Sequence, residues 1–454
     1  TRRRIVKRKL TAVLTVALAA GIMVTGCGSS GSGTTAKESA ATTAGDTTAA
    51  GDTSAAADTA TEAAKSGEVT TIRFYGSDSE YNQNIVAGFQ SENPDIKVEI
   101  VPVDFDNAEQ IIKTGIASGD PVDVSFFWGS QINAFTDDNM AYDITPYLTE
   151  NNNEWKDTFV PAYIDAGMVD GKYYAVSYQP VIETIFYNKD LFTQYNVELP
   201  KTWDEFVEAC KVFKDNGVYG VGNWNGQNHQ LLQFAYQYMA NDGTLEEYVA
   251  GKGDFTQCEG LKKCLENWKS VYDAGYWYPG EGALTSTKDQ TQAAWYQGKV
   301  AMLFDAGSNA GEYTKNSEFE VGILPFPYVA EGGKYALNTV TNALFIPANA
   351  KHPEEAVRFM KYYTSDAGIE EIIKSGRLPA TISMQDKVDS EILKDLLATT
   401  VGDNVVGYKQ MQGLSSEINS FLQNDMVGMV CTGTSVEDTL EQLEDLKQAT
   451  VKGE

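Results

Sequence analysis

The stretch TIRFYG, residues 71–76, opens the run of segments that decides the fold. It is followed by YNQNIVAGFQSE (81–92), IKVEIVPVD (96–104), NAEQIIKTGIAS (107–118) and VDVSFFWGS (122–130). The first, third and fifth segments are short and apolar, as strands are, whereas the second and fourth carry apolar residues at helical spacing. This alternation predicts an α/β fold with a largely parallel sheet, in which ligands bind at loops beyond the carboxyl ends of strands.

The chain before these segments has the pattern of a secretion signal. Residues 1–9 (TRRRIVKRK) hold six basic residues, and residues 10–24 form an uncharged, mostly apolar stretch. A membrane-spanning helix needs about 20 apolar residues, whereas a basic start and a shorter apolar core are typical of a signal peptide. Residues 24–27 (VTGC) are similar to the lipobox of bacterial lipoproteins, which implies a lipid on the thiol of Cys27. We therefore expect a lipoprotein signal peptide over residues 1–26.

Residues 27–67 are predicted to be the lipidated Cys27 followed by a disordered linker. After Cys27 this stretch is almost entirely Gly, Ser, Thr, Ala, Asp and Glu. Such a composition buries too little apolar surface to offset the entropy of ordering the chain. Coil scaling gives the linker a typical span of about 35 Å. The folded part is thus expected to stay lipid-anchored at the extracellular face of the bacterial cell membrane.

The acidic surplus excludes two classes of partner. The chain has 35 Lys and Arg against 63 Asp and Glu, a formal net charge of −28 at pH 7. Nucleic acid and anionic lipid surfaces both require basic patches, so we expect neither to be bound by the folded part. Residues 68–454 are enough for two domains of ordinary size.

The residues typical of metal sites and catalytic centres are sparse. Only His229 and His352 are available as imidazoles, no paired CxxC is present, and the motifs GxSxG and HExxH are absent. We therefore predict no metal and no cofactor. The many carboxylates could supply an acid/base pair, so residue types do not exclude a glycosidase, but no spacing singles out such a pair and we predict no enzyme. Buried thiols are the favoured interpretation of the cysteines beyond residue 67, which are Cys210, Cys258, Cys264 and Cys431. Cys258 and Cys264, expected on one helix, are too far apart for a disulfide.

Aromatic residues at predicted strand ends favour a sugar ligand. Trp128 and Trp224 stand at such ends, and glycine and amide residues flank both. A flat ring packs on the C–H face of a sugar, while Asn, Gln and Asp side chains hydrogen-bond its hydroxyls. Core packing is the alternative for any single aromatic residue, and it stays open here.

A series of short motifs extends over residues 70–445. In order they are VAGFQSENPDIKVEI (86–100), YDITPYL (142–148), DGKYYAVSY (170–178), FYNKDLF (186–192), LPKTWDEF (199–206), YQGKVAM (296–302) and HPEEAVRFMKYYTS (352–365). Their order and spacing resemble those of the family 1 extracellular solute-binding proteins. This group includes maltose-binding protein and other sugar-binding lipoproteins of ABC importers.

The resemblance implies a type II periplasmic-binding-protein-like fold, with two lobes around a ligand cleft and a mostly parallel, helix-flanked sheet in each. Lobe one would take residues 68–181 plus 337–382, and lobe two residues 186–332 plus 388–454. It also implies a monomer that captures a carbohydrate, an oligosaccharide in particular, by lobe closure and delivers it to the permease subunits of an ABC transporter. A cationic or peptide-like solute, or a secreted glycoside hydrolase, is the open alternative.

Some ligand contacts carry over from the family and some do not. Trp128 occupies the place of a tryptophan that faces the sugar in maltose-binding protein. Glu183, at the first crossing between lobes, would either reach the cleft or pair across the hinge. Where many members have glycine and a stacking aromatic, this chain has DAGSNAG (305–311), so Trp277 or Trp295 is a substitute platform unless it packs in the core. The full set of candidates is Asp78, Tyr81, Trp128, Tyr178, Gln179, Glu183, Trp224, Asn225, Gln227, Ser308 and Asn309.

Overall fold

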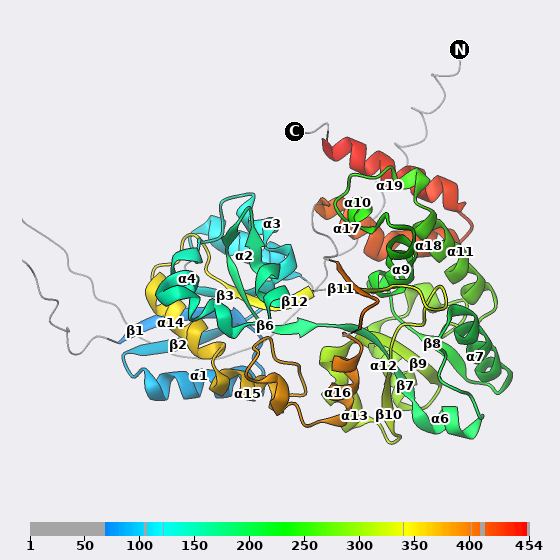
Figure 1. Ribbon diagram of the computed structural model, residues 1–454, viewed down its shortest axis with the longest axis horizontal. Helices are drawn as coiled ribbons and strands as arrows, with labels where there is room; N and C mark the ends of the chain where they lie inside the picture. Colours follow the sequence, from blue (N-terminus) through cyan, green and yellow to red (C-terminus); the bar gives the residue numbers. More distant parts are fainter. Residues whose placement is uncertain are drawn as a thin grey trace, which may run out of the picture. The chain divides into compact units, whose positions relative to one another are not determined.

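The computed structural model describes residues 69–103, 107–120, 122–338, 340–400, 402–408 and 414–451 (Figure 1). All of them belong to one unit of the fold, Lys65–Glu454. The expected signal peptide, Cys27 and the linker to residue 67 lie outside the described residues. Among the helices of the described ranges, none has the length and apolar character needed to cross a membrane.

The first sheet has five strands in the order β2-β1-β3-β12-β6. Their bounds are β1 (Thr70–Gly76), β2 (Ile96–Pro102), β3 (Val124–Trp128), β6 (Ala175–Val181) and β12 (Val340–Phe345). β1 pairs in parallel with β2 and β3, whereas β12 is antiparallel to both of its neighbours. Four strands therefore run one way, and β12 alone runs against them.

The second sheet repeats this arrangement with four strands in the order β10-β7-β9-β8. Their bounds are β7 (Glu183–Asn188), β8 (Tyr219–Gly222), β9 (Val300–Ala306) and β10 (Val321–Leu324). β8 and β9 are parallel, and β7 is antiparallel to β9 and β10. Two small sheets pair β4 (Met168–Val169) with β5 (Lys172–Tyr173) and β11 (Tyr335–Asn338) with β13 (Val405–Tyr408). The sequence predicted mostly parallel sheets but not the single reversed strand in each.

Helices follow most strands. Before residue 182 and in the segment after β12 they are α1 (Glu80–Glu92), α2 (Ala108–Ser118), α3 (Asn133–Thr136), α4 (Thr145–Asn153), α5 (Pro161–Ile164), α14 (Pro353–Tyr363) and α15 (Asp366–Lys374). The others are α6 (Lys189–Gln194), α7 (Trp203–Asp215), α8 (Asn228–Leu231), α9 (Gln233–Asp242), α10 (Leu245–Val249), α11 (Glu259–Asp273), α12 (Lys288–Tyr296), α13 (Ala310–Asn316), α16 (Glu391–Ala398), α17 (Ser416–Ser420), α18 (Met426–Cys431) and α19 (Val436–Val451). Between α17 and α18 lies a π-helical turn, Phe421–Asp425.

Local sequence sets several of these helix starts. Thr202 and Glu205 form a reciprocal capping box at α7, and Thr287 and Gln290 do the same at α12. Each box satisfies backbone N–H groups that the first helical turn leaves without partners. α14 begins at Pro353, which lacks the N–H that would otherwise need a partner at that position.

Apolar cores lie under both sheets. In the first, Phe74 of β1 packs against Phe359 of α14 with ring centroids 5.4 Å apart. In the second, Trp268 of α11 packs against Phe304 of β9 at 5.6 Å. Trp277 and Trp295 are fully buried in apolar clusters, so core packing is confirmed for both residues.

One connection between the two large sheets is very short. β6 ends at Val181 and β7 begins at Glu183, so only Ile182 separates them. Figure 1 shows β6 leading from the sheet of β1 and β3 toward β7. β11, which belongs to the small sheet with β13, is followed closely by β12 of the first sheet, from Asn338 to Val340. The backbone that crosses from the first large sheet to the second is therefore confined to Ile182 where β6 leads into β7.

The cysteines of the described residues are free and buried, as the sequence favoured. Burial raises the pKa of Cys258, Cys264 and Cys431 to about 12, and it also raises that of Cys210. Cys264 lies within α11, but Cys258 is the residue that precedes the helix rather than part of it. The expectation of one shared helix was wrong by one residue, because the chain first forms a 3₁₀ turn over Phe255–Gln257.

Candidate functional site

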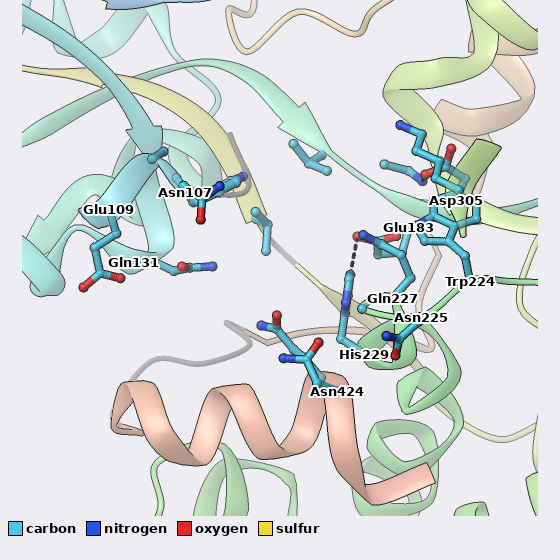
Figure 2. A pocket seen from close by; sticks show the side chains of 18 of the residues that line it. Asn107, Glu109, Gln131, Glu183, Trp224, Asn225, Gln227, His229, Asp305 and Asn424 are labelled. Atoms are coloured by element: carbon cyan, nitrogen blue, oxygen red, sulfur yellow. Dashed lines mark hydrogen bonds and ion pairs between the residues drawn. The ribbon is translucent and has the colours of Figure 1, made fainter. Parts of the chain in front are cut away.

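A cavity of about 1160 Å³ lies where the two sheets present their strand ends (Figure 2). Strands β3, β6 and β9 end at it, and the reversed strands β7 and β12 begin at it. Its lining residues are Asn107, Ala108, Glu109, Gln110, Lys113, Thr114, Trp128, Gln131, Val181, Glu183, Trp224, Asn225, Gly226, Gln227, His229, Thr285, Ser286, Thr287, Lys288, Asp305, Ala306, Asn338, Val340, Gln423 and Asn424. Each reversed strand thus brings its first residues to the edge where its neighbours end.

The first sheet contributes a partly exposed indole and a polar helix start. Trp128 closes β3 and is held edge-on by Phe126 and Phe127, with ring centroids 5.6 and 5.1 Å away. The first turns of α2 add amide and hydroxyl groups, and Lys113 there pairs with Glu109 at 3.1 Å. Figure 2 shows Asn107, Glu109 and Gln131 on one side of the cavity, opposite Glu183, Trp224 and Asp305.

The loop between β8 and α8 supplies the opposite wall. Gly226 turns this loop with φ +89°, a value that side chains disfavour. The backbone N–H of Asn225 donates a hydrogen bond to the backbone carbonyl of Ser286 at 3.0 Å, which ties the loop to the segment before α12. Trp224 is only 5 % exposed, and Lys288 Nζ stands 5.8 Å from the centroid of its ring. The indole therefore shows the cavity little of its surface.

Glu183 begins β7 at the cavity and is held by α8. Its Oε2 accepts a hydrogen bond from Gln230 Nε2 at 2.7 Å, and its Oε1 lies 3.4 Å from His229 Nε2. His229 Nδ1 is buried without a hydrogen-bond partner among the described residues. Glu183 thus faces the cavity and also pairs with two side chains of α8, a helix that follows β8 of the second sheet.

Asp305, at the end of β9, is the most enclosed carboxylate of the cavity, with 4 % of its surface exposed. It accepts hydrogen bonds from the Ala306 amide at 2.7 Å, Asn309 Nδ2 at 2.7 Å and the Tyr313 hydroxyl at 2.6 Å. Burial raises the pKa of Asp305 to about 6, although these donors and the charge of Lys288 act against the rise. The carboxylate is largely committed to its own loop.

Five of the predicted contacts line this cavity: Trp128, Glu183, Trp224, Asn225 and Gln227. The structure does not bring the remaining six to it. Asp78 is exposed and accepts from Gln83 Nε2 at 2.8 Å, and Tyr81 is buried in α1 beneath Arg377, whose guanidinium carbon lies 4.8 Å from the ring centroid.

Tyr178 and Gln179 are enclosed within β6, which is buried along its whole length. Tyr178 packs against Tyr363 with centroids 5.0 Å apart, and Gln179 has no exposed surface. Ser308 and Asn309 belong to a 3₁₀ turn after β9, where the Asn309 amide is directed to Asp305.

Several cavity residues were not predicted from the sequence. They are the α2 residues, Gln131, His229, the segment Thr285–Lys288, Asp305 and the pair Gln423 and Asn424. The strand-end rule could have found Asp305, because it ends an apolar run. The polar positions Gln110, Lys113 and Thr114 recur at helical spacing, which was a signal for α2.

Eight amide side chains dominate the cavity chemistry: Asn107, Gln110, Gln131, Asn225, Gln227, Asn338, Gln423 and Asn424. An amide both donates and accepts hydrogen bonds, and so does a hydroxyl group. The described residues contain no group of three His, Cys, Asp or Glu side chains arranged to hold a metal ion. The wall is therefore suited to a neutral, hydroxyl-rich molecule that also offers an apolar face to Trp128.

Residues 75–370 match the family model described as bacterial extracellular solute-binding protein. The chain belongs to this family. This solute-binding protein is 27 % identical to the multiple sugar-binding protein of Streptococcus mutans over 313 residues, 65 % of this chain and 71 % of the relative. It is 24 % identical to maltodextrin-binding protein MdxE of Bacillus subtilis over 408 residues, 85 % of this chain and 92 % of the relative.

A solved structure of this solute-binding fold superposes on most of the chain. It is the ABC substrate-binding protein Lmo0181 from Listeria monocytogenes in complex with cycloalternan, with a TM-score of 0.73 and 20 % identity. The match covers 85 % of this chain and 100 % of that one. The expected family and the expected type II, two-lobe fold are both confirmed.

Proposed function

We propose that this solute-binding protein captures an oligosaccharide in the cavity and delivers it to the permease subunits of an ABC transporter. The observation that carries the proposal is the lining of eight amides beside Trp128. Hydroxyl groups match the amides, and the apolar face of a sugar ring matches the partly exposed indole. The relatives named for sugars and maltodextrin support the same ligand class.

Lobe closure is the proposed mode of capture. Lobe one would comprise residues 68–181 plus 337–382, and lobe two residues 186–332 plus 388–454. A ligand favours closure only to the extent that it binds the closed state better than the open one. Contacts from both sides meet this requirement, with Trp128 on one side and Asn225 on the other. The protein would act as a monomer, and no reaction of the sugar is involved.

We also propose that the protein is lipid-anchored outside the cell. The support is the sequence: a signal peptide over 1–26, the modifiable thiol of Cys27, and a linker to residue 67. The membership in a family of extracellular solute-binding proteins agrees with this location.

A cationic solute is the second candidate, because Glu183 and Asp305 both line the cavity. The geometry supports it less well. Gln230 and His229 engage Glu183, and three internal donors engage Asp305. Asp78, an acid among the candidate contacts predicted from the sequence, does not line the cavity.

A thermal-shift panel tests the proposed function. The probes are maltotriose, N,N′-diacetylchitobiose, xylotriose, raffinose, spermidine and trialanine, added to the protein without a tag. A sugar present at about 100 times its Kd adds about 2.7 kcal/mol to the free energy of unfolding and raises the melting temperature. The sugar should be recovered intact by chromatography. A rise with spermidine or trialanine alone, or cleavage of the sugar, would overturn the proposal.

A further inference from the structure

The helix from Ser416 to Cys431 has an irregular apolar spacing. Ile418 is buried near its start, and from Phe421 onward its buried residues come in three neighbouring pairs: Phe421 and Leu422, Met426 and Val427, and Val430 and Cys431. The second interval is four residues, which in an α-helix returns a side chain to within about 40° of its starting direction. The first interval is five, which would leave it about 140° away. A regular α-helix cannot bury all three pairs on one face.

The π-helical turn Phe421–Asp425 resolves this conflict. The amide of Met426 donates to the carbonyl of Phe421, five residues earlier, instead of four. A turn closed by such a bond holds one more residue than an α-helical turn. The extra residue belongs to the polar run Gln423, Asn424 and Asp425, which separates the first two apolar pairs. The core register is thereby kept while the turn widens.

The widened turn faces the cavity. Gln423 and Asn424 line it, and Figure 2 shows Asn424 extending into it from its helix. The backbone carbonyl of Asn424 accepts a hydrogen bond from Asn228 Nδ2 at 3.3 Å. Asn228 belongs to α8, next to the cavity residue His229. Asn424 Nδ2 itself donates to Ser420 Oγ at 3.3 Å.

Asp425, the third polar residue of the turn, points elsewhere. It lines a shallow surface hollow beside Phe421 and Leu446 and is absent from the cavity lining. The turn thus separates its polar side chains, with two amides toward the cavity and one carboxylate toward solvent.

We propose that the π-helical turn is a ligand-contact element, in which one residue more than the helix needs places the Gln423 and Asn424 amides against the hydroxyl groups of a bound oligosaccharide. This inference rests on the proposed function and assigns it two specificity-determining residues far along the chain from Trp128. Without the extra residue, a regular α-helix would keep the apolar pairs on one face. The role of the extra residue is therefore to present the two amides to the cavity.

Deletion of Asn424 tests both halves of the proposal. The deletion brings Phe421 and Leu422 to an interval of four from the next apolar pair, so α17 and α18 can join as one α-helix. The melting temperature without sugar should stay within about 3 °C of wild type, the size of a 1 kcal/mol effect. In isothermal titration with maltotriose, N,N′-diacetylchitobiose, xylotriose and raffinose, the sugar that binds wild type should bind the deletion variant at least tenfold more weakly.

Two matched controls accompany it. Deletion of Lys263 in the regular helix α11 puts Leu261 out of phase with Cys264, Leu265 and Trp268, so the melting temperature should fall by about 10 °C or more. Asp425→Ala changes the same turn on its outer side and should leave sugar affinity within twofold of wild type. A second test variant, Asn424→Ala, removes the side-chain amide but keeps the turn. It should weaken sugar binding at least fivefold.

The outcomes separate this inference from the proposed function. If wild type binds one of the four sugars and the Asn424 variants bind it equally well, the ligand-contact role is wrong. If deletion of Asn424 destabilises the protein as much as deletion of Lys263, the extra residue is structural and the inference is overturned. If wild type binds none of the four sugars, the proposed function fails, and with it the ligand contact, whatever the melting temperatures show.

Discussion

His229 Nε2 lies 3.4 Å from Glu183 Oε1 in the wall of the cavity, with the two side chains 16 % and 10 % exposed. The second carboxylate oxygen accepts from Gln230 Nε2 at 2.7 Å. Neighbouring residues of α8 therefore hold both oxygens at the first residue of β7. The same contact fixes the start of that strand and orients a carboxylate toward the ligand space.

Glu183→Gln should destabilise the protein by about 1–3 kcal/mol, because an amide NH₂ replaces one acceptor oxygen in an enclosed site that presents donors. Urea unfolding followed by circular dichroism measures this. Glu320→Gln is the control: Glu320 is 71 % exposed and pairs with Lys189 at the surface, so its loss should cost less than about 1 kcal/mol. Equal stabilities of the two variants would contradict the role assigned to Glu183.

Trp128→Ala should weaken binding of the cognate sugar at least tenfold, about 1.4 kcal/mol. The indole is the most open aromatic surface in the lining, and alanine removes it. Isothermal titration measures the affinity, and Trp128→Phe, which keeps a ring, should recover part of it. The titration is run well below the melting temperature of each variant, so that lost packing on Phe126 and Phe127 does not enter. Unchanged affinity in the alanine variant would refute this contact.

Asp305 should make stability depend on pH. Burial raises its pKa in the folded protein to about 6, above the ordinary value near 4. The stability linked to the protonated carboxyl is therefore fully present below about pH 4 and is lost as the pH rises through 6. Asp305→Asn does not titrate, so between pH 4 and 7 the unfolding free energy of wild type should fall by about 2 kcal/mol relative to the variant. A constant difference across this range, measured by urea unfolding, would exclude the shift.

Cys27→Ser should release the protein from the membrane while leaving its sugar binding intact. A single acyl chain binds membranes only marginally, so durable anchoring needs the two or more chains that the cysteine would carry. Cell fractionation with an antibody against the folded part measures the distribution, and Ser29→Ala is the control that should remain bound. Continued retention of Cys27→Ser would count against the tether.

The sequence predicted the fold more completely than the site. Strand–helix alternation and the ordered motifs were sufficient for the two sheets, and the strand-end rule placed Trp128 and Trp224 at the cavity. The same rule could not assign Tyr178 and Gln179, because β6 is covered on both faces and so alternation along it carries no information about exposure. Nor could it foresee that Lys288 would stand over the Trp224 ring.

Residues from distant elements were the hardest to predict. Gln423 and Asn424 reach the cavity only because α8 lies beside their turn, a tertiary contact that no local pattern encodes. A local signal did exist, since the five-residue interval from Leu422 to Val427 is incompatible with a regular α-helix. That interval predicts an irregular helix, but it does not predict that the irregular turn faces the cavity.

The position of β12 between β3 and β6 has a consequence for synthesis. Phe345 of β12 pairs with Ser125 on one side and Ala175 on the other. The ribosome makes the chain from its amino end, so β3 and β6 emerge before the strand that joins them. All four strands of the second sheet, through Leu324, are made before that strand appears. The wall that carries Trp128 is thus completed only after the wall that carries Trp224 and Asp305 has been synthesised.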